Sequence, residues 1–210
     1  MRRRLILVIV LVDLAVVLAV GALILARHQR QQRALAQAAS MEAGPAPSSP
    51  RFTLHDAAGH LVTQDTYRGR SELVYFGYSF CPDICPTALG YQARLLKALG
   101  PDAARVVPLF ITIDPERDTP AHLAAYVTLF DPRIIGLTGS ADEVKGAANA
   151  FGAWYQRVIA DPGKPPLPPG QYLMDHTSST YLVDPEGRLV GTIDPQGSMT
   201  AALAAVRSCR

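Results

Sequence analysis

The most apolar stretch of the chain covers residues 5–26, where Asp13 is the only ionisable side chain. A helix of this length reaches about 33 Å, which matches a bilayer hydrocarbon core of about 30 Å. Asp13 near its middle should cost about 2.5–3.5 kcal/mol, but the many Leu, Ile and Val side chains outweigh that cost. A cleavable signal peptide has a shorter apolar region of about 7–15 residues. The pattern therefore predicts an uncleaved transmembrane anchor.

The segments around the anchor differ sharply in composition. Residues 27–50 begin with good helix formers and end in a stretch rich in Pro and Ser, which is typical of a stalk and linker. We expect residues 1–4 to be a short cytoplasmic flank and residues 51–210 to form one folded domain. Arg residues stand on both sides of the anchor, so the short amino-terminal flank decides the orientation, with the folded domain on the outer side of the membrane.

Within residues 51–210, two nearly continuous apolar runs stand out, at 73–78 and 105–113. Such runs are typical of strands that are buried on both faces of a sheet. Residues 87–100 lie between them, carry apolar side chains at helical spacing and end at Gly100-Pro101. The three segments together predict a β-α-β unit.

The remaining elements are predicted from alternation, turn residues and helix caps. They are a hairpin at 52–55 and 60–63, helices at 120–130, 140–152 and 198–208, strands at 134–139, 179–183 and 188–193, and a Pro-rich loop at 161–170. The pattern therefore predicts an α/β domain in which helices flank a mixed central sheet.

Composition and charge narrow the functional classes. The chain has 210 residues, of which 49% are hydrophobic and 18% charged, so one sizeable core is expected. The net charge of +2 is uneven, because six Arg and one Asp give residues 1–33 a charge of +5 and leave −3 for the remainder. A mildly acidic domain lacks the electrostatic footprint of a nucleic-acid-binding protein.

Candidate chemistry gathers at Cys81 and Cys85, which lie where the strand at 73–78 leads into the next helix. Pro86 suits a first helical turn, so the helix dipole should favour thiolates at this point, and we expect both thiols to be acidic and accessible. Three residues separate the two Cys, which leaves room for a metal ion as well as for a disulfide. Thiolates are soft ligands that select copper(I), zinc or iron–sulfur chemistry, and a pair of them requires a further partner.

The other candidates are weaker on their residues alone. His176 directly precedes the predicted strand at 179–183, but a histidine in such a place is more often a surface residue than a ligand. Cys209 is expected to be an exposed odd thiol. The alternating Asp114, Glu116 and Asp118 lack the glycine and the glutamate that a calcium loop needs. A structural disulfide between Cys81 and Cys85 remains an alternative, although closing so short a loop gains little.

Three separated segments, YFGYSFCPDICPTAL, ITIDPERDTPAHLAAYVTLF and DHTSSTYLVDPEGRL, resemble the Sco/SenC family in order and spacing. This family comprises membrane-anchored, thioredoxin-like copper proteins that help to assemble the CuA centre of cytochrome c oxidase. The resemblance implies a thioredoxin-like fold with an amino-terminal β-hairpin, and copper ligands at Cys81, Cys85 and His176. The family pattern also includes an Asp between the two Cys and an Asp before the His, here Asp83 and Asp175, and we expect them to support the ligands.

Two functions remain open on the same residues. The first is a copper metallochaperone that delivers copper to the CuA subunit of the oxidase, or prepares the thiols of that subunit. The alternative is a membrane-anchored thiol-disulfide oxidoreductase in which Cys81 and Cys85 form the redox pair. The resemblance further implies location in the inner (cytoplasmic) membrane, with other periplasmic copper chaperones or thiol reductases as further partners.

Overall fold

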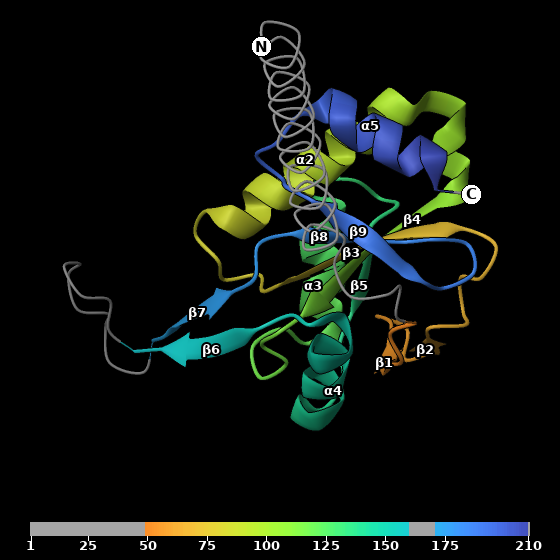
Figure 1. The fold of residues 1–210 in the computed structure, drawn as a ribbon. Coiled ribbons are helices and arrows are strands. Elements are labelled where there is room, and N and C mark those ends of the chain that lie inside the picture. Colours follow the sequence, from red (N-terminus) through yellow and green to blue (C-terminus); the bar gives the residue numbers. More distant parts are fainter. Residues whose placement is uncertain (1–48, 160–170, 210) are drawn as a thin grey trace, which may run out of the picture. The chain divides into compact units, whose positions relative to one another are not determined.

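A five-stranded mixed sheet lies at the centre of the computed structural model, which describes residues 49–159 and 171–209 (Figure 1). Its strand order is β5-β4-β3-β8-β9. Strands β3, β4 and β5 are parallel, whereas β8 and β9 are antiparallel to their neighbours. The strands are β3 (Ser71–Gly77), β4 (Val106–Thr112), β5 (Ile135–Leu137), β8 (Thr180–Val183) and β9 (Leu189–Ile193). The predicted mixed α/β sheet is confirmed.

Strands β3 and β4 form the interior of the sheet, as their continuous apolar runs predict. All residues of both strands are buried, because each strand has a neighbour on either side and helices pack on the faces of the sheet. Tyr75 pairs with Phe110 in register, and the two rings stack with centroids 6.2 Å apart. The carboxyl ends of β3 and β4 therefore lie at the same edge of the sheet, where ligand sites form in open α/β proteins.

The predicted helices are all present. They are α2 (Ile84–Leu99), α3 (Pro120–Thr128), α4 (Ala141–Phe151) and α5 (Met199–Ser208), and a 3₁₀ helix at Gly100–Arg105 follows α2. The Ser140 and Glu143 pair forms the predicted capping box of α4, and Thr119 caps α3. Helix α2 begins at Ile84, two residues before the predicted start near Pro86, which brings Cys85 into its first turn.

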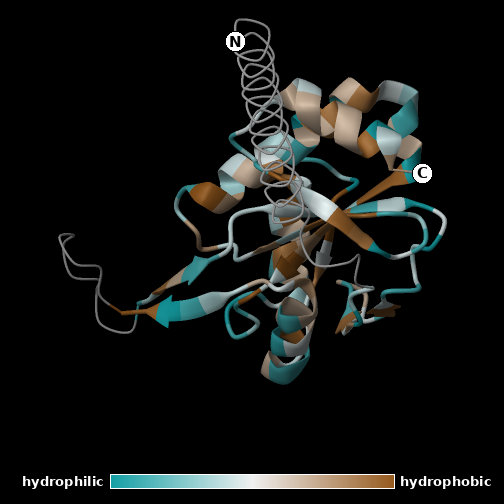
Figure 2. Cartoon of the chain, in the orientation of Figure 1, coloured by the Kyte–Doolittle hydropathy of each residue, from teal (hydrophilic) through white to brown (hydrophobic). Residues whose placement is uncertain are grey.

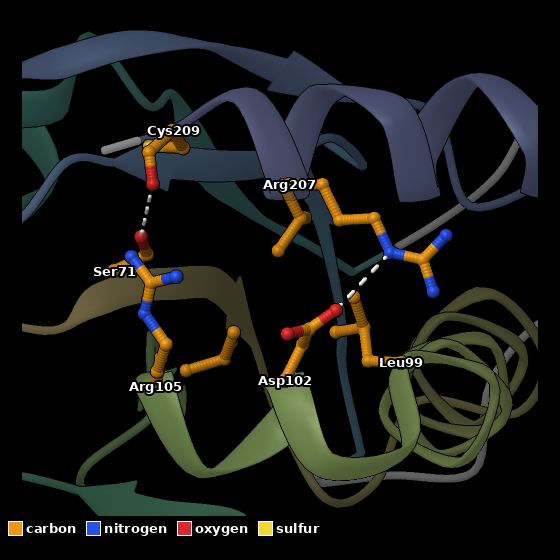
Figure 3. A pocket seen from close by; sticks show the side chains of 8 residues that line it. Ser71, Leu99, Asp102, Arg105, Arg207 and Cys209 are labelled. Carbon is orange, nitrogen blue, oxygen red and sulfur yellow. Dashed lines mark hydrogen bonds and ion pairs between the residues drawn. The ribbon is translucent and has the colours of Figure 1, made fainter.

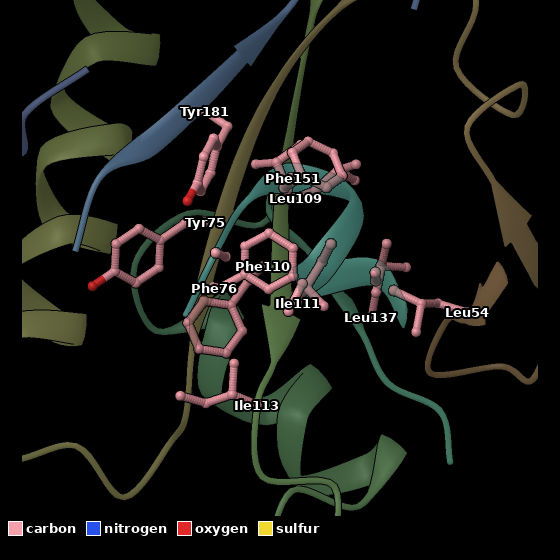
Figure 4. Packing of buried hydrophobic residues seen from close by; sticks show 14 of the residues in the cluster. Leu54, Tyr75, Phe76, Leu109, Phe110, Ile111, Ile113, Leu137, Phe151 and Tyr181 are labelled. Carbon is pink, nitrogen blue, oxygen red and sulfur yellow. The ribbon is translucent and has the colours of Figure 1, made fainter. Parts of the chain in front are cut away.

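Helices cover both faces of the central sheet. Leu95 and Leu99 of α2 share an apolar cluster with Val206 of α5 on one face. On the other face, Phe151 of α4 packs against Phe76 and Tyr181 (Figure 4). The apolar character of the sheet is visible in Figure 2, where the central strands are largely brown, whereas α4 carries both brown and teal residues.

The predicted amino-terminal hairpin is confirmed as β1 (Thr53–His55) paired with β2 (Leu61–Thr63). It lies beside the end of β5, because backbone hydrogen bonds of 2.7 and 2.9 Å join His55 and Thr138. Leu54 is fully buried in the main core. The hairpin therefore extends the core past the edge of the sheet.

A second hairpin was not predicted and carries a candidate ligand. Strands β6 (Tyr155–Val158) and β7 (Leu173–His176) pair antiparallel and form a sheet of their own. His176 is therefore the last residue of β7, a strand that the sequence did not predict, and it still precedes the predicted strand, β8. The sequence between 153 and 176 lacks a clear alternation, so only the tertiary pairing shows the strands. The predicted Pro-rich loop at 161–170 lies outside the described residues.

The predicted anchor at 5–26, and nearly all of the stalk and linker, also lie outside the described residues. Among residues 49–159 and 171–209, no helix has the length and hydropathy needed to cross a membrane.

Cys209 departs from its prediction, because its side chain is buried rather than exposed. It follows α5, and its carbonyl accepts a hydrogen bond of 3.3 Å from the Ser71 hydroxyl of β3 (Figure 3). Burial raises the pKa of the Cys209 thiol. The carboxyl end of α5 thus attaches to the first residue of β3, and the thiol is a small apolar group in the core.

Glu72 is an acidic residue inside this apolar sheet, and it predicts a pH dependence of stability. Its side chain is only 2% exposed, and burial raises its pKa to about 7, above the value of 4.5 expected in the unfolded chain. The folded state therefore binds more protons than the unfolded state between these two values, so stability falls as pH rises through this window and then levels off. The expected loss is on the order of 2–3 kcal/mol.

Urea unfolding of the wild type and Glu72→Gln between pH 5 and pH 8 measures this loss. Glu72→Gln should gain stability relative to the wild type as pH rises, because its amide carries no charge to bury. Parallel stability curves for the two proteins would contradict the assignment.

Candidate metal centre

The two cysteines occupy different local environments at the start of α2. Strand β3 ends at Gly77 and α2 begins at Ile84, so Cys81 lies in the connecting loop and Cys85 in the first helical turn. Cys81 is partly buried, whereas Cys85 is fully buried. The backbone N–H of Cys85 donates a hydrogen bond to the Cys81 sulfur at 3.4 Å. The amino end of α2 thus faces the Cys81 sulfur, as the predicted role of the helix dipole requires.

Gly77 makes the burial of Cys85 possible. A Cβ at this position would lie 2.9 Å from the Cys85 sulfur, 2.9 Å from Cε1 of Tyr75 and 3.0 Å from Cε2 of Phe110. The two distances of 2.9 Å are shorter than real contacts of a Cβ, and the third is at the limit of such contacts. The thiol of Cys85 therefore occupies the space that any other residue at position 77 would fill.

His176 reaches the cysteines from the end of β7. Its Nε2 atom lies 3.3 Å from the Cys85 sulfur. The possible ligand atoms of Cys81, Cys85 and His176 all lie within 4.8 Å of one another. Tertiary structure thus unites three residues that span almost a hundred positions of the sequence.

The tautomer of His176 follows from its second hydrogen bond. The Nδ1 atom lies 2.9 Å from the backbone carbonyl oxygen of Thr177, which can only accept. We therefore place the ring proton on Nδ1, which leaves the lone pair of Nε2 directed at the sulfur. Asp175, the group predicted to orient this ring, is exposed and makes no hydrogen bond to His176 in the described part of the chain. A backbone carbonyl fills the role predicted for the carboxylate.

Two tyrosines of β3 and its following loop hold the His176 ring. The rings of Tyr75 and Tyr78 meet the imidazole edge to face, at centroid distances of 6.0 and 6.1 Å. The Tyr78 hydroxyl also accepts a hydrogen bond of 3.1 Å from the backbone N–H of Met174 in β7. The separate hairpin is thereby attached to the central sheet beside the cysteines.

The two thiols have opposite acidities, so the prediction that both are acidic and accessible is wrong for Cys85. The Cys85 thiol donates a hydrogen bond that lowers the pKa of Cys81 to about 4 against the opposing effect of burial. Burial and then the neighbouring Cys81 raise the pKa of Cys85. Without metal, the pair therefore holds one thiolate at Cys81 and one proton at Cys85.

The loop before Cys81 is anchored by a carboxylate whose importance the sequence did not show. Asp118 is fully buried and accepts hydrogen bonds from the Ser79 backbone N–H at 3.1 Å, from the Ser79 hydroxyl and from the Thr112 hydroxyl at 2.7 Å. His122 also lies 2.8 Å from the Ser79 hydroxyl and stacks on Phe80. The parallel pairing of β3 with β4 brings the loops that follow them together. This pairing is the sequence signal that could have pointed to a contact between Asp118 and the loop before Cys81.

The remaining sequence candidates lie apart from the group. His55 and His60 belong to the β1–β2 hairpin, and Cys209 follows α5. Asp83 caps α2 without a side-chain hydrogen bond, but its backbone N–H contributes to the low pKa of Cys81. The predicted support from Asp83 thus comes from its backbone in this structure.

The donor set suits a soft metal ion. Two sulfurs and one imidazole nitrogen are ligands that copper(I) and zinc accept, and the three atoms lie close enough together to share one ion. The buried Cys85 would lose its proton on binding such an ion, which compensates for the cost of a buried negative charge. The chemistry of the residues therefore fits a metal.

The comparisons with known proteins agree with this geometry. The family model described as SCO1/SenC matches residues 40–209. The SCO2-like protein of Rickettsia felis is 41% identical over 137 residues, covering 65% of this chain and 64% of that protein. The mitochondrial protein SCO1 of Saccharomyces cerevisiae is 38% identical over 186 residues, covering 86% and 61%. The chain thus spans just under two thirds of the length of these curated relatives.

Among solved structures, Bradyrhizobium japonicum ScoI with copper bound is 36% identical, with a TM-score of 0.69, and the match covers 78% of this chain and 99% of that one. The domain accordingly has the thioredoxin-like α/β fold of the Sco proteins. The family model covers most of the chain, including both cysteines and the histidine, and so the protein belongs to the SCO1/SenC family.

Proposed function

We propose that this protein is a copper metallochaperone that binds copper through Cys81, Cys85 and His176. The observation that carries the proposal is the approach of these three ligand atoms to within 4.8 Å of one another. The copper bound in the similar ScoI structure supports the identity of the metal. Copper is here the cargo, and no substrate is turned over.

Each ligand has a distinct part in the proposed binding. The Cys81 thiolate is partly exposed and already charged, so it is the first ligand that an incoming ion meets. Cys85, held by the sheet beneath it, exchanges its proton for the metal. The imidazole of His176 completes the set through Nε2. Release by ligand exchange begins at Cys81 and His176, since both are partly exposed.

The surface around the site suits a protein partner. Phe80 precedes Cys81 and is 49% exposed, and Trp154 precedes the β6 residue that pairs with His176 and is 53% exposed. Exposed aromatic side chains are enriched in protein interfaces. From its family membership we propose that the partner is the cytochrome c oxidase subunit carrying the CuA site, with periplasmic copper chaperones or thiol reductases as further partners. The apolar residues 5–26 support anchoring in the inner membrane, with the copper-binding domain on the outer, periplasmic or equivalent side.

A thiol-disulfide oxidoreductase is the second candidate, favoured by the acidic Cys81. A partly exposed thiolate next to a second, protonated thiol can attack a disulfide and then be resolved. The same low pKa also suits metal binding. The two functions therefore differ in whether they require His176.

Removal of any one ligand should abolish tight copper binding. Anaerobic copper(I) titration of the full chain, in competition with a chelator, should give one copper per wild-type chain. Cys81→Ser, Cys85→Ser and His176→Ala should each weaken binding more than about 100-fold, because two remaining ligands leave copper(I) under-coordinated. Cys209→Ser and His60→Ala are the controls and should bind like the wild type, because both residues lie apart from the three ligands. No tight copper in the reduced wild type would overturn the chaperone proposal.

Alkylation should distinguish the two thiols. Because the pKa of Cys81 is lowered to about 4, its thiolate persists, and its rate of labelling by iodoacetamide should stay nearly constant from about pH 8 to about pH 6. An ordinary thiol slows about tenfold per unit over this range. Cys85→Ala should restore the ordinary decline, since it removes the main hydrogen-bond donor to Cys81. Peptide mapping by mass spectrometry measures each site, and an ordinary decline at Cys81 in the wild type would contradict the assignment.

His176→Ala separates the two functions. Reduction of a model disulfide needs only Cys81 and Cys85, so an oxidoreductase should keep most of its rate in this variant. A chaperone should lose transfer of copper(I) to an acceptor bearing the CuA ligands. If copper transfer survives the loss of His176 while Cys81→Ser abolishes disulfide reduction, the oxidoreductase becomes the better reading.

A further inference from the structure

Tyr75 carries a polar group that the fold leaves without a partner. Its side chain is completely buried in β3, and its hydroxyl makes no hydrogen bond within residues 49–159 and 171–209. A buried hydroxyl without a partner destabilises the folded chain, so the presence of one beside a candidate site needs an explanation. Phenylalanine would fill the same space without this cost.

The Tyr75 ring lies against two of the three proposed ligands. Tyr75 and Gly77 project from the same face of β3, since they are two residues apart. The space above Gly77 is bounded at equal distance by the Cys85 sulfur and by Cε1 of Tyr75, the ring atom next to the carbon that bears the hydroxyl. The same ring contacts His176 edge to face. In Figure 4 the Tyr75 hydroxyl points away from the aromatic cluster, towards the side on which α2 lies.

The acceptor strength of the Cys85 sulfur depends on its charge. A protonated thiol is a weak acceptor, whereas a thiolate is a strong one, and hydrogen bonds to charged groups are the stronger class. A tyrosine hydroxyl keeps its proton at neutral pH, so the hydroxyl of Tyr75 can donate it in a hydrogen bond. A donor without a partner thus lies next to a sulfur that becomes a good acceptor once it binds copper.

We propose that Tyr75 is a positioning residue for the copper site, whose hydroxyl donates a hydrogen bond to the Cys85 sulfur when that sulfur is a copper ligand. The inference rests on the proposed copper-binding function. On loading, the S–H bond of Cys85 breaks, its proton leaves to solvent, and a copper–sulfur bond forms with no change of oxidation state. The hydroxyl of Tyr75 then gains the partner that it lacks in the metal-free fold.

The Tyr75 hydroxyl has opposite effects on the stability of the metal-free and the copper-loaded protein. The unpartnered hydroxyl weakens the metal-free protein, and its hydrogen bond strengthens the copper-loaded one. A residue that served only to fill the core would affect both states in the same direction. The opposite effects on the metal-free and the copper-loaded protein therefore provide the test.

The experiment compares Tyr75→Phe with Tyr91→Phe in the full chain, purified in detergent. Tyr91 is the matched control, because its hydroxyl is also buried without a partner, but it packs in the separate apolar cluster around α2 and α5. Three properties are measured: the melting temperature of the metal-free protein, the affinity for copper(I) against a chelator, and the ultraviolet absorption of the copper(I)–thiolate bonds.

Tyr75→Phe should keep or raise the melting temperature, yet bind copper(I) about tenfold more weakly, as expected for the loss of a charge-assisted hydrogen bond. Its copper–thiolate absorption should move to longer wavelength, because the sulfur electrons are less stabilised. Tyr91→Phe should keep or raise the melting temperature and leave affinity and absorption unchanged.

Equal affinity and absorption in Tyr75→Phe and the wild type would overturn the inference and leave the copper site intact. A fall in melting temperature and affinity together would also overturn it, because that result shows a merely structural role. Failure of the wild type itself to bind copper(I) would instead remove the proposed function, and the inference with it.

Discussion

The candidate site depends on the close approach of α2 to β3 at Gly77. The absence of a side chain there lets the Cys85 thiol lie close against the sheet, where the rings of Tyr75 and Phe110 bound the same space. Interiors pack as densely as crystals, so a position that accepts a sulfur in van der Waals contact accepts nothing larger without displacing the helix. The first turn of α2 is thus fixed by the strand that precedes it, and one ligand inherits the rigidity of the sheet.

The chemical difference between the cysteines follows from that packing. Four residues along a chain that turns from loop to helix are enough to place one sulfur in the core and the other near solvent. The low dielectric of the core disfavours charge on Cys85, and its proton in turn stabilises charge on Cys81. In such a pair, Cys81 is already a thiolate, whereas Cys85 would lose its proton only when a metal ion binds.

Two separate attachments bring the rest of the site to the same edge of the sheet. Asp118, in the loop between β4 and α3, accepts three hydrogen bonds from Ser79 and Thr112, which fixes the loop that carries Cys81. The hydroxyl of Tyr78 binds the backbone of β7 and thereby sets the position of His176. The histidine stands on a hairpin outside the central sheet, so it can adjust more freely than Cys85. Cys85 is held by the sheet, whereas Cys81 lies in a loop and His176 on a separate hairpin. This combination suits a site that opens for ligand exchange.

The sequence by itself determined the class of the fold and the identity of the candidate ligands. The buried runs of β3 and β4, the caps of α3 and α4 and the two closely spaced cysteines are local patterns, and local patterns can be read from neighbouring residues. Family resemblance was needed to select His176 from five histidines, because no local pattern marks a ligand that is remote in sequence. The tertiary structure alone decided that His176 ends a strand, that Asp118 anchors the cysteine loop, and that Cys85 and Cys209 are buried. These properties arise from packing and from low dielectric, which depend on residues that are distant along the chain and adjacent only in the fold.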